Sequence, residues 1–156
     1  KRLMESSLEV VQKLSECFGR DIYHNGRLNR GLLSSRVFGK SDKIVLLNSI
    51  VHPVVRFDFY RWSESLNEEI CFVESAILYE SRFDELVDEV WTVTAPEELR
   101  ISRVRQRSGL TEEEIKKRMA AQLSEEEKQR RAAHIIWNDG NVSVIHRVLS
   151  LLKSLE

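Results

Sequence analysis

The chain has 156 residues, of which 42% are apolar and 31% are charged, and its formal net charge at pH 7 is −1. This balance is typical of a globular domain and excludes a disordered chain or a nucleic-acid binder that relies on net positive charge. With two cysteines and no apolar run of membrane-spanning length, the sequence predicts a cytoplasmic, helix-rich protein that binds neither nucleic acid nor a membrane.

The first predicted helix begins near a capping box, in which Ser6 and Glu9 would satisfy free backbone N–H groups at the helix start. Apolar residues then recur at helical spacing as far as Phe18, and Gly19 stands where a helix commonly ends. Asn25-Gly26 predicts a turn after this helix.

Residues 28–66 keep a helical period of apolar side chains. The period is interrupted at His52-Pro53, and proline is well tolerated at the first position of a helix. We therefore expect three short helices over 28–66, forming a helical subdomain.

Gly39-Lys40-Ser41 has the ending of a phosphate loop, whose form is G-x-x-x-x-G-K-[ST]. The position five residues before Gly39 is Ser34, and the preceding segment is predicted to be a helix instead of a strand. A phosphate loop needs a strand before it so that its backbone N–H groups point at the phosphate, and a preceding helix does not provide this. The pattern therefore favours an ordinary turn between helices.

Short, continuous apolar runs begin at Ile70, and we expect strands at 70–78, 90–93 and 134–137. Runs without a polar face, separated by helical segments, are typical of a parallel sheet covered on both sides. The predicted fold class is therefore α/β.

Three helix starts follow the second predicted strand, since Thr94, Thr111 and Ser124 each precede a glutamate by three residues. Many charges in this segment pair at i,i+4 spacing, as Glu112 does with Lys116, which explains them as a solvated helix surface.

That explanation does not cover Arg100, Arg103 and Arg107, which are spaced to share a helix face and are not followed by an acidic residue at helical spacing. Together with Arg118, Arg103 and Arg107 form a candidate clamp for a polyphosphate, because guanidinium groups bind phosphate bidentately. A solvated charged face is the alternative, and spacing alone favours it.

Polar residues also flank the predicted strand ends, where open parallel sheets bind ligands. Glu74 and Glu80 flank the end of the first strand and could hold a metal ion or orient a hydroxyl; a helix cap or an ion pair explains them equally well. Asn138-Asp139-Gly140 follows the third strand and could contact a base edge, although a simple tight turn is the favoured interpretation.

Taken in order, these motifs resemble the dephospho-CoA kinase family from about Ser6 to about Leu152. The motifs are Leu28-Asn29-Arg30, Val37-Phe38, His52-Pro53 with Arg56, Ala76-Ile77-Leu78-Tyr79-Glu80, Val93-x-Ala95-Pro96-Glu97, Arg103-x-x-x-Arg107, Arg118-x-x-x-Gln122, Glu126 with Lys128, and Asn138-x-Gly140. The resemblance implies a kinase-like domain over 1–156 with a three-layer parallel sheet, helices on both faces, an acceptor-binding subdomain at 28–66, a lid at 105–131 and a core at 70–104 and 132–156.

The resemblance also implies an activity: transfer of the ATP γ-phosphate to the ribose 3′-hydroxyl of dephospho-CoA, with Mg²⁺ as cofactor and ATP and dephospho-CoA as partners. It assigns catalysis to Arg103, Arg107 and Arg118, nucleotide binding to Gln122, Asn138 and Gly140, and acceptor binding to Arg30, His52, Arg56, Tyr79 and Glu80. Glu74 is a possible metal ligand.

Family members open with a strand, a phosphate loop and a helix, and the resemblance implies that this chain begins after them. We therefore expect the N-terminal part of the sheet to be missing from this chain and the chain to be inactive alone. Two alternatives remain: a kinase of the nucleoside monophosphate kinase type, and a fragment that binds CoA or nucleotides without catalysis.

Overall fold

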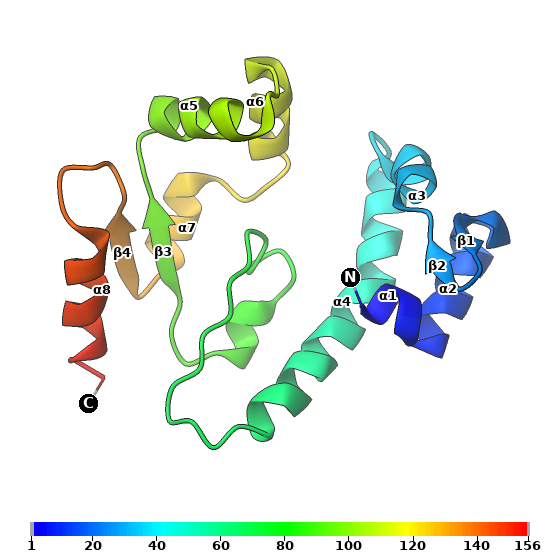
Figure 1. Cartoon of the computed structure of the whole chain (residues 1–156), viewed down its shortest axis with the longest axis horizontal. Coiled ribbons are helices and arrows are strands. Elements are labelled where there is room, and N and C mark those ends of the chain that lie inside the picture. The colour runs from blue at the N-terminus through cyan, green and yellow to red at the C-terminus, as the bar shows by residue number, and fades with distance from the viewer. Residues whose placement is uncertain (1, 156) are drawn as a thin grey trace. The chain divides into compact units, whose positions relative to one another are not determined.

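A computed structural model of the chain describes residues 2–155. It has a mixed α/β fold (Figure 1) and divides into two compact units, residues 1–73 and residues 74–156. No helix within residues 2–155 is both long enough and apolar enough to cross a membrane.

The first unit is mainly helical. Its elements are α1 (Leu3–Ser6), α2 (Leu8–Phe18), the 3-10 helix η1 (Arg20–Ile22), β1 (Tyr23–His24), β2 (Arg27–Leu28), α3 (Arg30–Val37) and α4 (Ser41–Glu64). Side chains from these elements form one apolar core that comprises Val10, Leu14, Phe18, Ile22, Leu28, Leu33, Val37 and Ile50. Burial of each large apolar side chain in this core stabilises the unit by about 1.5–3 kcal/mol.

The predicted end of the first long helix is confirmed, because Gly19 is the C-cap of α2 with φ of +94°. The predicted cap at its start is wrong by one residue. Ser6 belongs to α1, and the hydroxyl of Ser7 accepts the Val10 N–H at 3.5 Å. The Asn25-Gly26 turn is confirmed, and it joins β1 and β2 as an antiparallel hairpin.

The expectation of three short helices over 28–66 is wrong, because α4 runs without a break through Pro53. A proline in a helix interior costs about 3 kcal/mol. Ile50 is buried in the core, and Leu47, Val51 and Val54 pack against it. Burying this continuous apolar face on both sides of Pro53 outweighs the lost backbone hydrogen bond.

The second unit contains a small parallel sheet. Its elements are η2 (Phe83–Leu86), β3 (Trp91–Thr94), α5 (Glu97–Ser108), α6 (Glu112–Ala120), α7 (Glu125–Arg131), β4 (His134–Trp137) and α8 (Val144–Leu152). β3 and β4 pair in parallel from Trp91 with His134 to Thr94 with Trp137, which confirms two of the predicted strands. α7 packs on β3 and α8 on β4 (Figure 1).

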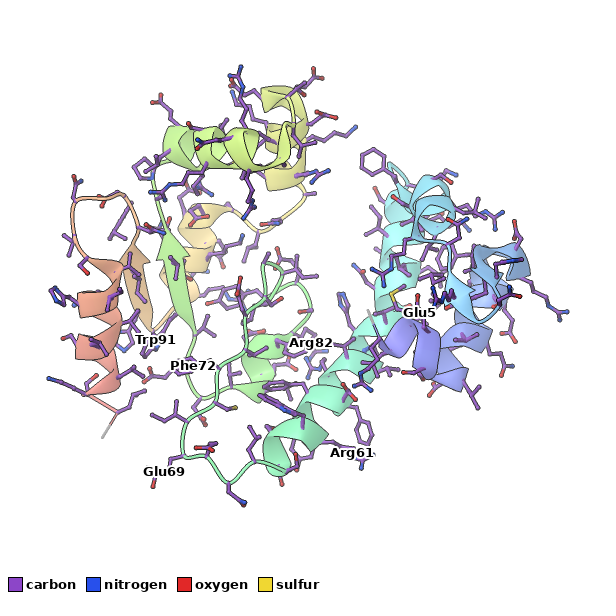
Figure 2. The ribbon with its side chains drawn as sticks, in the orientation of Figure 1. Glu5, Arg61, Glu69, Phe72, Arg82 and Trp91 are labelled. Carbon is purple, nitrogen blue, oxygen red and sulfur yellow. The ribbon has the colours of Figure 1, made fainter. Side chains whose placement is uncertain are left out.

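The predicted strand at 70–78 is wrong. Residues 70–75 have no regular structure and residues 76–82 form turns. Phe72, labelled in Figure 2, is 63% exposed. A strand needs a neighbour for its backbone hydrogen bonds, and within residues 2–155 no strand pairs with this segment, since β3 and β4 pair with each other.

The predicted caps in the charged segment are confirmed at two of three positions. Thr111 and Glu114 form a reciprocal capping box at α6, and the Ser124 hydroxyl accepts the Glu127 N–H at α7. Thr94 is wrong as a cap, because it ends β3 and the N-cap of α5 is Pro96. The Glu112–Lys116 pair is confirmed at 2.7 Å.

Candidate active site

The candidate site of the second unit lies at the carboxyl ends of β3 and β4, which the parallel register brings side by side. The Asn138 N–H donates a 2.7 Å hydrogen bond to the Thr94 carbonyl oxygen, so the loop after β4 starts directly beside the end of β3. This edge is where open α/β sheets bind ligands.

The loop after β4 is held in two ways. Arg103 of α5 donates a 2.6 Å hydrogen bond from Nη1 to the Asn138 carbonyl oxygen. The Asp139 carboxylate accepts hydrogen bonds from the Asn141 backbone N–H at 3.0 Å and the Asn141 side-chain amide at 2.9 Å. These bonds, with a smaller contribution from Arg103, lower the pKa of Asp139. Gly140 has φ of +91°, a conformation that favours glycine.

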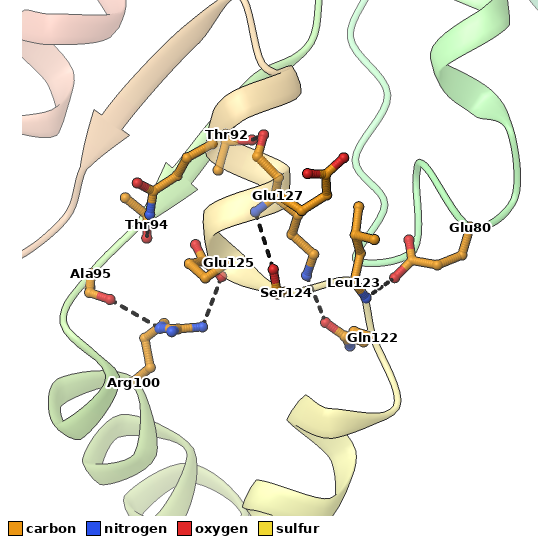
Figure 3. Close-up of polar contacts among 12 residues, drawn as sticks. Glu80, Thr92, Thr94, Ala95, Arg100, Gln122, Leu123, Ser124, Glu125 and Glu127 are labelled. Atoms are coloured by element: carbon orange, nitrogen blue, oxygen red, sulfur yellow. Dashed lines mark hydrogen bonds and ion pairs between the residues drawn. The ribbon is translucent and has the colours of Figure 1, made fainter.

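Arg100 joins α5 to α7, as Figure 3 shows. Its Nε donates to the Ala95 carbonyl oxygen at 3.0 Å, and its Nη1 contacts a Glu125 carboxylate oxygen at 2.9 Å. The arginine that local spacing left unpaired therefore has an acidic partner 25 residues later, which only the fold brings near.

Arg107 and Arg118 are exposed on α5 and α6. Within residues 2–155 neither guanidinium forms a hydrogen bond or an ion pair, although Arg118 contributes to the lowered pKa of Glu114. The structure brings Arg103 to Asn138, whereas it gives neither Arg107 nor Arg118 a contact with that loop in the described part of the chain. Both side chains remain available to an anionic ligand.

Gln122 lies between α6 and α7, and its Oε1 accepts a hydrogen bond from Lys128 Nζ at 3.0 Å (Figure 3). Beside it, the Leu123 N–H donates to Glu80 Oε1 at 2.6 Å. Glu80 is therefore tied to the segment between the two helices. Sequence patterns contained no signal for this contact, because the two residues are 43 positions apart.

Tyr79 is buried, and its hydroxyl has no hydrogen-bond partner within residues 2–155. The guanidinium carbon of Arg131 lies 4.1 Å from the centre of the Tyr79 ring, and Arg131 also pairs with Asp84 at 2.8 Å. Burial raises the pKa of Tyr79, and Arg131 partly opposes that shift. The phenol is therefore neutral at pH 7 and can donate a hydrogen bond.

In the first unit, His52 and Arg56 lie one turn apart on α4 and are both partly buried. Residues four apart share a helix face. Burial lowers the pKa of His52, so its imidazole is neutral at pH 7. Arg30 opens α3, and its Nη2 lies 3.9 Å from Glu5 Oε1.

Two further observations bear on ligands. Among residues 2–155 no group of three or more His, Cys, Asp and Glu side chains could together hold a metal ion. An open hollow of about 500 Å³ lies in the first unit, lined by His24, Asn25, Arg27, Leu28 and Asn29. None of the predicted site residues lines this hollow.

A family model described as dephospho-CoA kinase matches residues 1–143. Dephospho-CoA kinases from Bacteroides fragilis and Salinibacter ruber are 35% and 38% identical to this chain over 156 and 151 residues. These matches cover 99% and 94% of the chain and 76% of each relative.

Solved structures are similar as well. A Thermus thermophilus protein titled TT1252 is 32% identical, with a TM-score of 0.79 over 92% of this chain and 74% of its own. Dephospho-CoA kinase from Campylobacter jejuni is 23% identical, with a TM-score of 0.67 over 99% of this chain and 82% of its own, a likeness of fold.

Proposed function

Because the chain belongs to the dephospho-CoA kinase family, we propose that the complete protein transfers the γ-phosphoryl group of ATP to the ribose 3′-hydroxyl of dephospho-CoA. The observation that carries the proposal is the match of the family model over residues 1–143, which include every candidate site residue. The link between Arg103 and Asn138 at the strand ends supports it, because it joins two of those residues.

In this proposal the Asn138 loop binds the adenine. Asn138 offers a side-chain amide with both a donor and an acceptor, which suits the edge of a base. Gly140 lets the backbone approach a flat ring closely. Arg103 keeps the Asn138 carbonyl in place and adds positive charge beside the nucleotide.

Arg107 and Arg118 are proposed to neutralise the charge on the transferring phosphoryl group, and Gln122 to contact the nucleotide. Phosphoryl transfer depends mainly on positioning and electrostatic stabilisation, so guanidinium groups in the correct place suffice for a large effect. The absence of internal partners for Arg107 and Arg118 within residues 2–155 supports this role, because no ion pair has to break before phosphate binds.

For acceptor binding we propose candidates separately for each of the two units. In the first unit, Arg30, His52 and Arg56 are the candidates, and the neutral imidazole of His52 can accept or donate a hydrogen bond at pH 7. In the second unit, Tyr79 is the candidate, and it lies within the turns at 76–82. Its neighbour Glu80 accepts the Leu123 N–H in the structure, so a separate role is proposed for it.

Mg²⁺ is expected with ATP in phosphoryl transfer, where it neutralises the β- and γ-phosphates. The described residues do not supply a protein ligand set for the ion, because no cluster of three candidate ligands occurs among residues 2–155. Glu74 is the one carboxylate that we propose for a single metal contact.

An acceptor screen tests the proposed function. The full-length protein is incubated with ATP and Mg²⁺ and with dephospho-CoA, each nucleoside monophosphate or no acceptor, and ADP release is measured. We expect turnover with dephospho-CoA alone. Turnover of a nucleoside monophosphate without turnover of dephospho-CoA would assign the chain to another acceptor, and nucleotide binding without turnover would favour a non-catalytic role.

A further inference from the structure

Helix α7 is fixed to the core of the second unit along its length. At its first residue Glu125 pairs with Arg100 at 2.9 Å, in a partly buried contact. Further along, Gln129 Nε2 donates to the Thr94 hydroxyl at 3.4 Å, and the last residue, Arg131, pairs with Asp84. Although 105–131 was expected to act as one lid, these contacts tie its last helix to β3 and η2.

Helix α6 is attached differently, because its main contacts are with α5. Between α6 and α7 lies a junction of four residues, 121–124, in which Gln122 is a proposed nucleotide contact. Arg118 precedes the junction by one turn. The position of both side chains relative to the sheet therefore depends on how this junction is held.

Glu80 holds the junction from outside. Its Oε1 accepts the Leu123 N–H at 2.6 Å, a charge-assisted bond from a residue 43 positions earlier in the chain (Figure 3). The Leu123 N–H precedes the first turn of α7 and has no backbone carbonyl as a partner in the described part of the chain. The neighbouring Tyr79 packs under Arg131, the last residue of α7. Tyr79 and Glu80 therefore contact the chain at the end of α7 and just before its start, respectively.

We propose that Glu80 is a positioning residue for phosphoryl transfer: by accepting the Leu123 N–H it sets the place of the junction, and through it the places of Arg118 and Gln122. The proposal rests on the proposed function. It differs from a direct acceptor contact, because Glu80 then acts through the lid and its effect falls on kcat instead of the KM of dephospho-CoA.

Three substitutions at Glu80 in the full-length enzyme separate the two roles. Glu80→Gln keeps an oxygen that can accept the Leu123 N–H, Glu80→Asp keeps the charge but is one methylene too short, and Glu80→Ala keeps neither. Because small displacements of catalytic groups can reduce rates by about a hundredfold, we expect kcat to fall at least about tenfold in E80A and E80D. E80Q should stay within about threefold of the wild type, with the KM of dephospho-CoA little changed in all three.

Amide hydrogen exchange at Leu123 is the second measurement, and it does not depend on activity. We expect exchange about tenfold faster in E80A and E80D than in the wild type and in E80Q, because the bond to the N–H is lost. Glu98→Ala, which removes an exposed carboxylate on α5, should change neither readout. Thermal unfolding would establish whether each variant is folded. If E80A does not fold, the comparison of E80Q with E80D still tests the proposal.

Two results would overturn the proposal: an equal rise in the KM of dephospho-CoA in E80Q and E80A with kcat retained, or unchanged Leu123 exchange in E80A and E80D. A wild-type enzyme that fails to phosphorylate dephospho-CoA would contradict the proposed function instead. The exchange comparison would then still decide whether Glu80 holds the junction.

Discussion

Arg103 Nη1 donates a 2.6 Å hydrogen bond to the carbonyl oxygen of Asn138, 35 residues further along the chain. The bond links α5, the helix that leads into the charged segment, to the loop that follows β4. The helix that carries Arg107 is thereby held beside the loop proposed to bind adenine. This one contact would therefore position both the proposed adenine contact, Asn138, and the proposed phosphate contact, Arg107.

Arg103→Ala should weaken ATP binding, because the loop loses the bond that fixes the Asn138 carbonyl. We expect the KM of ATP to rise about tenfold, the equivalent of one charge-assisted hydrogen bond. Steady-state kinetics with ATP varied at saturating dephospho-CoA measure this. An unchanged KM of ATP in Arg103→Ala would show that the contact does not support the nucleotide site.

Arg118→Ala should lower kcat about a hundredfold or more, because a guanidinium that stabilises the transferring phosphoryl acts mainly in the transition state. The KM of dephospho-CoA should change little. Arg147→Ala, which removes an exposed arginine of α8, is the matched control. A kcat within twofold of the wild type in Arg118→Ala would contradict the assignment of this residue to the lid.

His52→Ala should raise the KM of dephospho-CoA about tenfold and leave kcat nearly unchanged, since the proposed contact is to the acceptor in its ground state. His146→Ala removes an exposed histidine of α8 and should have no such effect. Kinetics with dephospho-CoA varied at saturating ATP distinguish the two. Equal behaviour of the two variants would remove His52 from the acceptor site.

Leu14→Ala should destabilise the first unit by about 2–5 kcal/mol, because Leu14 is fully buried and its loss leaves a cavity. Leu8→Ala is the control: Leu8 is 87% exposed, so a change within about 0.5 kcal/mol is expected. Denaturant unfolding of both variants measures the difference. Similar unfolding midpoints would contradict the packing of α2 described above.

Asp21→Asn should reduce the loss of stability in acid. Arg36 donates hydrogen bonds to both carboxylate oxygens of Asp21, which lowers the pKa of Asp21 in the folded chain. A carboxyl with a lowered folded pKa contributes stability above its unfolded pKa of about 3.9, and this contribution disappears as pH falls through the folded value.

The measurement for Asp21 is the thermal unfolding midpoint at pH 7 and at pH 3. The midpoint of the wild type should fall more between the two than that of Asp21→Asn. Glu68→Gln, at an exposed carboxylate outside the helices, should behave as the wild type does. A wild-type decrease no larger than that of Asp21→Asn would mean that the ion pair contributes nothing.

Features set by neighbouring residues were predictable from the sequence. Gly19 ends α2 and the Thr111–Glu114 capping box starts α6 because each depends on contacts within one turn. The strand predicted at 70–78 is absent from the structure, because strand formation depends on a partner strand that the segment's own residues do not specify.

The candidate site shows the same division. Family motifs named Arg103 and Asn138 as separate candidates, and the fold supplied the bond between them. The contact of Glu80 with Leu123 had no sequence signal, because a backbone N–H looks the same in every residue type except proline. α4 also departed from expectation, because burial in the tertiary core overrode the local preference of Pro53.

The most direct test of the central claim is the identity of the product formed by the full-length protein from ATP and dephospho-CoA. Mass spectrometry and phosphorus NMR should show one added phosphoryl group, present as a monoester on the ribose 3′-oxygen, with one ADP formed for each product. A phosphate at any other position, or ADP formed without a phosphorylated acceptor, would contradict the account.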